Sequence, residues 1–529
     1  QEAMKEVIEE KGLNRVVVAS CSPRTHEALF QETIHEVGLN PHLFQLANIR
    51  DQCSWVHMQE PERATEKARD LVRMAASRVV RHRPLHGEPL PVTHSGLVLG
   101  GGLTGMTAAL KMAEQGYDVH LVERQSELGG NARHIRRTLY GQDVQEKLRQ
   151  MVVRVRAEER ITVHTNATLE ATDGFVGNYT STIRYHDDGS GPSEVEVDHG
   201  VLIVATGAEE RETSEYLYGQ DEQVMTQREL EEALADDAFT LPSERPGTVV
   251  MIQCVESRTT EHPYCSRVCC SQAIKNAIAI KERHPESNVV ILYRDIRTYG
   301  LREEFYRRAR DLGVLFVPYD LEPDEAGRGG PPTVEKVGDA LDVSVYDPLL
   351  DQEIVLQPDA LILSVGMAPR DDAERVARML KVPLNEERFF LEAHMKLRPV
   401  EFSTEGVYLA GLAHGPKFIE ESISQAGAAV SRACTVLSQE QILSAGSVAQ
   451  VDAINCSACG DCMEICPYQA IELTTVEIAR DTYKTCAQVN AAICKGCGAC
   501  AAGCRAGCIT LEGFDDSQIM AQIMALVSS

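Results

Sequence analysis

Short apolar runs alternate with helical patterns through the middle of the chain. The runs at 96–99, 117–122 and 201–204 predict buried strands, because each is bounded by glycine or polar residues and is too short for a helix. Between the first two, 103–115 has apolar residues at helical spacing. Strands that alternate with helices predict a parallel sheet with helices on its faces.

The same pattern is repeated further along the chain. A run at 247–253, a helical stretch at 271–283 and a second run at 288–293 have the order strand, helix, strand. The predicted fold class is therefore α/β, with two Rossmann-like units in succession.

Smaller segments flank this double unit. Residues 1–85 combine helical patterns with an apolar strand pattern at 15–20, and a proline-rich linker follows at 84–91. The predicted domains are a small N-terminal α/β domain at 1–85, a double Rossmann domain at 92–440 whose second unit is 247–370, and a cysteine-rich domain at 447–529.

The composition narrows the class of partner. The 529 residues include 79 acidic and 52 basic side chains, and the net charge of −27 opposes binding to nucleic acid or to anionic membrane surfaces. We therefore expect protein partners. No apolar run is long enough to span a membrane and no leader is recognisable, so we expect a cytoplasmic protein. The chain starts at Gln1 inside a helical pattern, and we expect further residues upstream.

A glycine turn joins the first predicted strand to its helix. Gly100 permits a tight turn, Gly102 leaves room for a pyrophosphate, and Gly105 lets the helix approach the strand. Backbone N–H groups and the helix dipole would hold the pyrophosphate there. Glu123 ends the next strand about 20 residues later, where a carboxylate accepts from a ribose hydroxyl. The glycine turn alone is weak evidence for a dinucleotide site, because an ordinary flexible turn can have the same glycine spacing.

Three further segments support a dinucleotide site. Gly129-Gly130-Asn131 follows the acidic residue, and apolar strands lead into Ala205-Thr206-Gly207 and into Gly411. In this order the segments resemble the FAD-binding half of the thioredoxin-reductase type of flavoprotein. That family usually has Asp after the last glycine, where this chain has Leu412. The resemblance implies FAD, with contacts from Gly100, Gly101, Gly102, Thr104, Gly105, Glu123, Arg124, Gly129, Gly130, Asn131, Ala205, Thr206, Gly207 and Gly411.

The second unit lacks the glycines that a nicotinamide site needs. Its first strand runs into Cys254, and no glycine occurs before the next helix, which argues against a stand-alone NAD(P)H oxidoreductase. Zinc and structural burial are alternatives for the cysteines found here. We favour one [4Fe–4S] cluster, held by the four thiolates of Cys254, Cys265, Cys269 and Cys270.

Two cysteine runs near the end of the chain give the most specific signal. Their spacing, C-x2-C-x2-C-x3-C, is that of bacterial ferredoxins with two [4Fe–4S] clusters, in which the fourth cysteine of each run ligates the other cluster. We expect one cluster on Cys456, Cys459, Cys462 and Cys504, and the other on Cys494, Cys497, Cys500 and Cys466. The chain has 17 cysteines, and their crowding into short motifs favours metal ligation over disulfides. We expect Cys434, Cys486 and Cys508 to be structural.

The cysteine segments resemble the A subunit of heterodisulfide reductase. The similarity covers the cysteine spacing at 254–270, Ala19-Ser20-Cys21-Ser22-Pro23-Arg24 and Asn48-Ile49-Arg50-Asp51-Gln52-Cys53-Ser54-Trp55. The chain is identified as an N-terminally truncated short form of this family. Two lone cysteines are otherwise ordinary buried side chains. The resemblance implies that Cys21 and Cys53 help to ligate a fourth cluster, completed by upstream residues.

The same resemblance gives Lys275 a role. A lysine in the second turn of a helix is ordinarily solvated, but the family has a lysine here at the flavin ring, where an ammonium stabilises an anionic reduced flavin.

The resemblance also implies an oxidoreductase subunit with FAD and three complete [4Fe–4S] sites. We expect flavin-based electron bifurcation between a two-electron donor, ferredoxin and a disulfide or similar acceptor. The alternative is a plain electron relay, as in quinone-interacting or class II benzoyl-CoA reductase-type complexes. The implied partners are heterodisulfide reductase B- and C-like subunits, a hydrogenase or formate dehydrogenase subunit that supplies electrons, ferredoxin, and a second copy of the chain.

Overall fold

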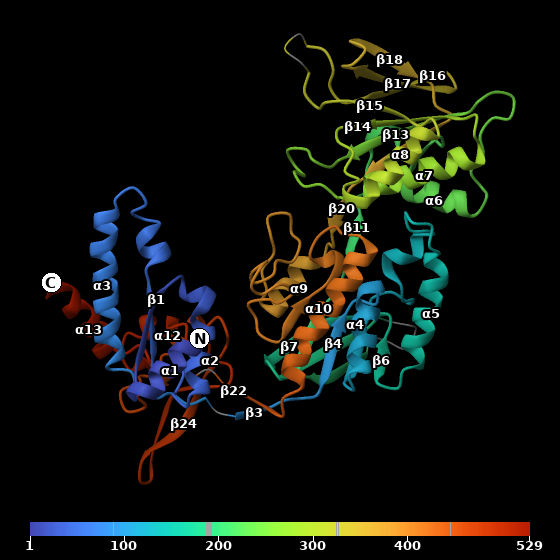
Figure 1. Ribbon diagram of the computed structural model, residues 1–529. Coiled ribbons are helices and arrows are strands. Elements are labelled where there is room, and N and C mark those ends of the chain that lie inside the picture. The colour runs from blue at the N-terminus through green and yellow to red at the C-terminus, as the bar shows by residue number, and fades with distance from the viewer. Residues whose placement is uncertain (88, 187–192, 324, 326, 445, 529) are drawn as a thin grey trace. The chain divides into compact units, whose positions relative to one another are not determined.

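The computed structural model describes residues 1–87, 89–186, 193–323, 325, 327–444 and 446–528. They form two compact units. One unit is continuous, Val92–Gln439, and the other combines Gln1–Pro91 with Glu440–Ser529. The second unit therefore contains both the blue and the red ends of the colour scale in Figure 1. Residue 88 of the linker expected at 84–91 lies outside the described residues.

The first Rossmann sheet of the continuous unit has five parallel strands. In sheet order they are β21 (Val407–Leu409), β10 (Val201–Val204), β4 (Ser95–Leu99), β5 (Asp118–Val122) and β6 (Ile161–His164). Packed against it are α4 (Leu103–Glu114), α5 (Val144–Ala157) and α10 (Ile419–Leu437). β4 and β10 are buried along their whole length, as their uninterrupted apolar sequences require. Because the strands are parallel, their carboxyl ends meet at one edge.

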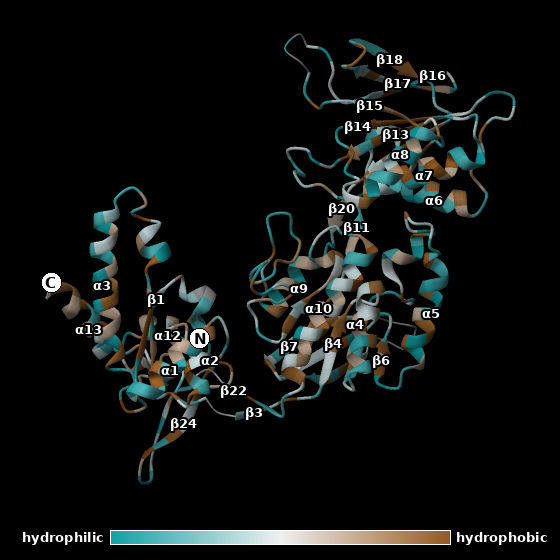
Figure 2. Ribbon diagram, in the orientation of Figure 1, coloured by the Kyte–Doolittle hydropathy of each residue, from teal (hydrophilic) through white to brown (hydrophobic). Residues whose placement is uncertain are grey.

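The second Rossmann sheet is also five-stranded and parallel. In sheet order its strands are β12 (Val224–Thr226), β19 (Ala360–Val365), β13 (Thr248–Val255), β14 (Asn288–Tyr293) and β15 (Leu315–Pro318). Its helices are α6 (Gln227–Ala235), α7 (Cys269–Arg283) and α8 (Glu303–Asp311). Figure 2 shows apolar, brown residues along β13 and β14, and both strands are almost entirely buried. The predicted α/β class with two Rossmann-like units is confirmed.

Smaller sheets complete the continuous unit. Two antiparallel sheets consist of β7 (Ala167–Phe175), β8 (Asn178–Tyr185) and β9 (Ser193–His199), and of β16 (Thr333–Val337), β17 (Ala340–Asp347) and β18 (Gln352–Leu356). A short pair, β11 (Ala208–Glu210) and β20 (Met367–Pro369), joins the two Rossmann units, because β11 follows β10 and β20 follows β19. The helix α9 (Ala373–Leu380) packs on β7.

The other unit combines two segments from opposite ends of the sequence. The earlier segment contains α1 (Glu2–Lys11), β1 (Val16–Ser20), α2 (Pro23–Glu36), β2 (Phe44–Asn48), α3 (Pro61–Val79) and β3 (Pro89–Pro91). The later segment contains β22 (Gln441–Leu443), β23 (Ala449–Val451), α11 (Asp461–Ile465), β24 (Ile471–Ala479), β25 (Thr482–Val489), α12 (Ala499–Gly503), β26 (Ile509–Leu511) and α13 (Asp516–Val527). β1 and β2 are parallel, whereas β3 pairs with β22, β23 with β26 and β24 with β25 in antiparallel fashion.

These two segments, expected as separate domains, pack together along α3 and α13 (Figure 1). The guanidinium of Arg78 lies 4.1 Å from the centroid of the Phe514 ring and donates to the Gly513 carbonyl at 3.1 Å. Arg73 Nε donates to the carbonyl of Ala525 at 2.9 Å. Of the helices that the structure describes, none is both long and apolar enough to cross a lipid bilayer.

Candidate functional site

A cavity of about 860 Å³ lies at the carboxyl edge of the first Rossmann sheet. The loops after β4, β5 and β10 form it, together with β11 and the start of α10. Most of the predicted cofactor contacts line this cavity, namely Gly100, Gly102, Thr104, Glu123, Arg124, Gly129, Gly130, Asn131, Ala205, Thr206 and Gly207. Segments that are separate in the sequence thus line one cavity together.

The glycine turn has the geometry that a pyrophosphate needs. Gly100 has φ +114°, and a Cβ added to Gly105 would lie 1.8 Å from the carbonyl oxygen of Gly100, so the helix approaches the turn as closely as glycine allows. At Gly102 the nearest atom to an added Cβ is Gly130 Cα, at 4.0 Å. Space beside Gly102 is therefore open, and the N-terminus of α4 faces it. These residues fit the diphosphate of a bound dinucleotide.

Three of the predicted contacts have a different role. Gly101, Gly105 and Gly411 do not line the cavity but support its wall. The N–H of Gly101 donates to Glu123 Oε2 at 2.7 Å. Glu123 Oε1 accepts a second backbone N–H, that of Gln125, at 2.8 Å. The carboxylate expected to bind a ribose hydroxyl therefore also fixes the turn.

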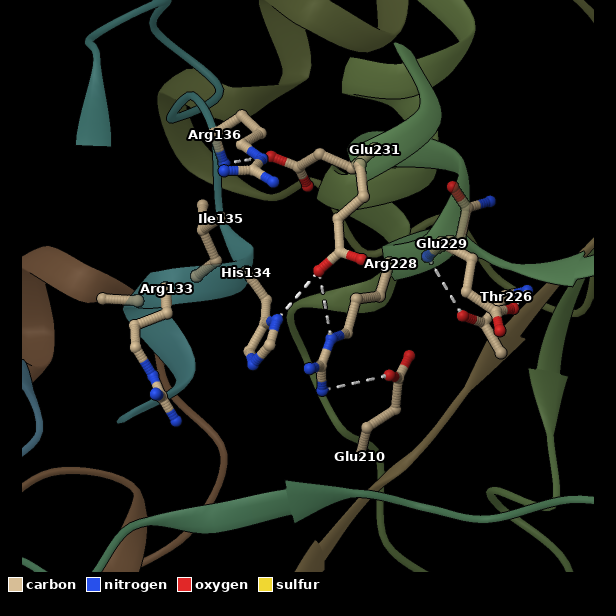
Figure 3. Close-up of polar contacts among 12 residues, drawn as sticks. Arg133, His134, Ile135, Arg136, Glu210, Thr226, Arg228, Glu229 and Glu231 are labelled. Carbon is tan, nitrogen blue, oxygen red and sulfur yellow. Dashed lines mark hydrogen bonds and ion pairs between the residues drawn. The ribbon is translucent and has the colours of Figure 1, made fainter. Parts of the chain in front are cut away.

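Four titratable side chains, from the segment after β5, from β11 and from α6, form a linked polar group in the wall of the cavity (Figure 3). Arg228 lies between two carboxylates, 3.9 Å from Glu210 and 3.7 Å from Glu232. Nδ1 of His134 is 2.8 Å from Glu232 Oε1. Burial raises the pKa of Glu210 to about 7, and Arg228 opposes that shift. None of these four residues is among those predicted from the sequence.

A narrower cavity of about 190 Å³ adjoins the first, and the first turns of α7 line it. Lys275, the lysine expected at the flavin, is on this wall, but its ammonium is paired with Glu231 Oε2 at 2.7 Å. It also donates to the carbonyl of Arg137 at 2.9 Å. Glu231 Oε1 accepts the backbone N–H of Arg136 at 2.8 Å (Figure 3). Burial lowers the pKa of Lys275, and Glu231 opposes the shift.

The segment 254–270 contains the four cysteines expected to hold a cluster. It runs from the end of β13 through the following loop to the first turn of α7, and we call it the cysteine loop. Cys254, Cys269 and Cys270 are buried, and Cys265 is half-buried. Four non-glycine residues of this loop have left-handed backbones, with φ between +50° and +61°: Cys254, Glu256, Arg258 and Arg267. Each costs roughly 1–2 kcal/mol relative to an ordinary conformation. The surrounding contacts must therefore hold the loop in this shape.

The cysteine thiols of this loop influence one another. A hydrogen bond with Cys270, together with burial, raises the pKa of Cys269 well above its usual range. The same hydrogen bond lowers the pKa of Cys270 to about 7. Within the described part of the chain, no three Cys, His, Asp or Glu side chains are grouped closely enough to hold a single metal ion.

Two arginines tie this loop to the walls of the cofactor cavity. Arg211 lines the larger cavity, and its guanidinium lies 2.9 Å from His262 Nε2 and 3.0 Å from the Tyr264 hydroxyl, both within the loop. Arg267, between Cys265 and Cys269, donates to the Pro416 carbonyl at 3.0 Å and to Glu421 at 2.7 Å, at the start of α10.

Each ferredoxin-type run contributes to two small cavities in the other unit. Each cavity has a volume of about 20 Å³. The first is lined by Cys456, Cys459, Cys462 and Cys504, and the second by Cys466, Cys494, Cys497 and Cys500. The fourth cysteine of each run thus lies with the first three of the other run. Backbone N–H groups point at the sulfurs, for example Ala458 N to Cys456 Sγ at 3.4 Å and Ala470 N to Cys466 Sγ at 3.3 Å. Such contacts fit thiolate ligands of a cluster.

Four other cysteines lie in this unit outside the two regular runs, namely Cys21, Cys53, Cys486 and Cys508. Cys508, expected to be only structural, lines the first of these cavities, and its Sγ is 3.4 Å from that of Cys504. Cys21 follows β1, and Cys53 lies in the short helical segment after β2. Because β1 and β2 are parallel neighbours, both cysteines lie beyond the same edge of their sheet. Cys53 Sγ is 3.0 Å from the Ala64 carbonyl oxygen, so this thiol has a protein partner.

Comparisons with known proteins agree with this arrangement. Residues 98–158 match the family described as NAD(P)-binding Rossmann-like domain, and residues 455–516 match the 4Fe-4S dicluster domain. The chain is 36% identical to the second iron-sulfur A subunit of the CoB--CoM heterodisulfide reductase of Methanopyrus kandleri, over 89% of this chain and 84% of that protein. The chain belongs to the family of heterodisulfide reductase A subunits.

A second member of the heterodisulfide reductase A-subunit family gives a similar result. The A subunit of the H(2):CoB-CoM heterodisulfide,ferredoxin reductase of Methanothermobacter thermautotrophicus is 34% identical, over 88% of this chain and 82% of that protein. Among solved structures, Lactococcus lactis thioredoxin reductase in the FR conformation aligns with 65% of this chain and 99% of that chain, at a TM-score of 0.44 and 17% identity.

Membership in the heterodisulfide reductase A-subunit family makes this chain an oxidoreductase component that carries FAD and [4Fe–4S] clusters. The identification from sequence motifs is therefore confirmed. The motifs did not reveal the polar residues around the cavities, such as Glu231, Arg211 and Lys417. For Arg211 the sequence offers one local signal: it lies only four residues after Gly207, a predicted cofactor contact.

Proposed function

We propose that this chain binds one FAD in the larger cavity and three [4Fe–4S] clusters, and that it divides electron pairs between two acceptors by flavin-based bifurcation. The observation that carries the proposal is the direct contact between the cysteine loop at 254–270 and the walls of the cofactor cavity. Arg211 belongs to the wall and bonds to the loop, and Arg267 belongs to the loop and bonds to α10. A cluster on this loop would be a neighbour of the flavin.

The loss of the nicotinamide turn supports the same proposal. No glycine lies between Cys254 and α7, so the second Rossmann unit lacks the feature that would hold a pyridine nucleotide pyrophosphate. Electrons then have to enter and leave through clusters. FAD supplies the exchange between two-electron and one-electron transfer when it is bound. The residues of this chain contribute its position, its electrostatic surroundings and its distance from the clusters.

The names of relatives suggest donors and acceptors. One relative is named as part of an H(2):CoB-CoM heterodisulfide,ferredoxin reductase, and another as part of a ferredoxin/F(420)H(2)-dependent CoB-CoM heterodisulfide reductase. By analogy, we propose that this chain takes electrons from a two-electron donor and passes them to ferredoxin and to a disulfide or similar acceptor. Its partners would be B- and C-like subunits, a hydrogenase or formate dehydrogenase subunit for electron input, and a second copy of the chain.

A plain electron relay is the second candidate, and one observation favours it. Bifurcation benefits from an unpaired cation at the flavin, but the ammonium of Lys275 is neutralised by Glu231 at 2.7 Å. A relay has no need of such a charge. The choice therefore depends on whether the two outputs are obligatorily coupled.

The assembled complex, with its natural electron donor, tests this coupling. For bifurcation, ferredoxin is reduced only while the higher-potential acceptor is reduced too, with equal numbers of electrons to each. Ferredoxin reduction that continues after the second acceptor has been omitted would establish the relay instead.

The isolated chain tests the cofactor assignments. After anaerobic reconstitution we expect one FAD and about twelve cluster irons, four for each of three sites. Cys269→Ser should lower the iron to about eight, keep FAD bound and abolish electron passage from flavin to the neighbouring cluster, whereas Cys434→Ser should change nothing. Iron near eight with one zinc in the unaltered chain would mean that zinc occupies the loop. Rapid flavin bleaching by NADH or NADPH would refute the proposal.

A further inference from the structure

The start of α10 carries a second lysine that the family resemblance did not point to. Lys417 lies two residues before the first residue of this helix, and it lines both the larger and the narrower cavity. Several other residues are shared by the two cavities, so Lys417 stands where they adjoin. The N-terminal end of α10 adds the positive end of its helix dipole at the same place.

This junction is at the flavin-ring end of the cofactor cavity. The turn at Gly102 and the start of α4 hold the pyrophosphate, and Glu123 at the end of β5 marks the side of the adenosine ribose. A dinucleotide lies extended across such a turn. The opposite end of the cavity, at the start of α10 where the narrower cavity adjoins, is left for the isoalloxazine ring.

A polar network fixes the position of Lys417. Its Nζ is 3.3 Å from Nδ1 of His414 and 3.2 Å from the carbonyl oxygen of Gly415. Nε2 of His414 contacts the carboxylate of Glu392. Gln425 joins the network by its amide, 3.0 Å from His414 Nδ1, and accepts the N–H of Gly411 at 2.8 Å. The network occupies the region where the thioredoxin-reductase type usually has an aspartate and this chain has Leu412.

Lys417 differs from Lys275 in the state of its charge. Among the residues that the structure describes, no carboxylate lies within 4.0 Å of the Lys417 ammonium, whereas Glu231 lies 2.7 Å from that of Lys275. Burial and then the neighbouring Arg267 lower the pKa of Lys417 to about 8, with Glu421 and Glu392 opposing. The side chain thus remains mostly protonated at neutral pH.

We infer that Lys417, positioned by His414, is the cation that stabilises the reduced flavin in this chain. The inference rests on the proposed FAD site. A reduced flavin that loses its N1 proton is an anion, and a fixed ammonium at the ring favours that form over the neutral oxidised form. Lys417 contributes charge without a proton transfer, and the network from Glu392 to Gly411 keeps it in place. Lys275 with its paired carboxylate contributes little net charge.

Potentiometric titration of FAD in the reconstituted full chain tests this inference. Lys417→Gln should make the two-electron potential more negative, with at least a tenfold smaller equilibrium constant for reduction, which is about 30 mV for a two-electron couple. Lys417→Arg should stay close to the unaltered protein. The exposed Lys396→Gln is the matched control for loss of one positive charge, and it should leave the potential unchanged.

The possible results are distinguishable. A Lys417→Gln protein that holds FAD and titrates like the unaltered protein overturns the inference while the proposed function stands. Loss of FAD from Lys417→Gln also overturns it in this form, because the lysine would then bind the cofactor rather than tune it. If the unaltered protein binds no FAD, the proposed function fails and the inference fails with it.

Discussion

The carboxylate of Glu231 holds the ammonium of Lys275 at 2.7 Å in the wall of the narrower cavity. The two side chains are 5% and 17% exposed, so the pair is shielded from water on most sides. A charge pair of this kind has little net field at a distance. The effect of either residue on a nearby cofactor therefore depends on whether its partner is present.

We predict that the two single substitutions at this pair act in opposite directions on the flavin. Glu231→Gln should raise the two-electron potential of FAD, because it frees the ammonium, and Lys275→Met should lower it, because it leaves a buried carboxylate. Each should also lower the free energy of unfolding by on the order of 3 kcal/mol. The double substitution should lie nearer to the unaltered protein in both respects. Potentiometric titration and chemical unfolding measure these effects, and purely additive shifts would contradict the pairing.

Two glycines of the cofactor turn should respond differently to a larger side chain. Gly102→Val should fold normally but fail to bind FAD, since the added atoms project into open space that the pyrophosphate needs. Gly105→Val should destabilise the fold itself, because its Cβ would lie 1.8 Å from the Gly100 carbonyl oxygen. Flavin content and melting temperature separate the two. The clusters of the other unit should keep their electron paramagnetic resonance signals in both variants.

A third prediction concerns the thiol pair at the first ferredoxin-type cavity. Cys508 Sγ is 3.4 Å from Cys504 Sγ and lines the same cavity, so it is placed to replace the lost ligand in Cys504→Ala. We expect that variant to keep about twelve irons with an altered spectrum, and Cys504→Ala with Cys508→Ala to fall to about eight. Cys486→Ala is the control, because this buried cysteine does not line the cavity. Loss of four irons from the single Cys504 variant would disprove the replacement.

Acid should destabilise the continuous unit through His199. Burial lowers the pKa of His199 to about 4, and the ring is bonded to Ser181 at 2.8 Å and to the Val201 carbonyl at 2.9 Å. The unfolded chain takes up this proton near pH 6.5 and the folded chain only near pH 4. Stability is therefore complete above about pH 6.5 and falls as the pH drops toward 4, by about 3 kcal/mol in all.

Chemical unfolding at about pH 7 and about pH 5 measures this loss. The variant His199→Gln should show a smaller difference between the two conditions, because its side chain does not titrate. His35→Gln, at an exposed position, should behave like the unaltered protein. An equally steep decline in His199→Gln would assign the acid sensitivity to other groups.

Local sequence was enough to predict the parts of the site that depend on backbone geometry or ligand spacing. The glycine turn and the cysteine runs each depend on residues that are close together in the sequence. The turn folds as expected because Gly100 and Gly105 let the helix approach the turn more closely than any other residue type permits. The neighbours of the cofactor cavity could not be found in this way. Glu231 and Lys275 come from α6 and α7, and only the packing of these helices brings them together.

The same reason explains two other differences from expectation. Cys508 lies four residues after Cys504 but outside the regular run, so its sequence position offered no reason to place it at the first cavity. The contact of Arg78 with Phe514 joins residues from opposite ends of the sequence, and no local pattern encodes such a pairing.

That pairing sets an order of events during synthesis. The segment Gln1–Pro91 is translated before the continuous unit, whereas α13, the helix that covers α3, is translated after it. The continuous unit at 92–439 has all its strands available in the meantime and is able to fold first. Until α13 arrives, the face of α3 that carries Arg78 has no partner. Cells in which translation pauses between the continuous unit and α13 should therefore accumulate chains in which 92–439 is folded while α3 is still uncovered.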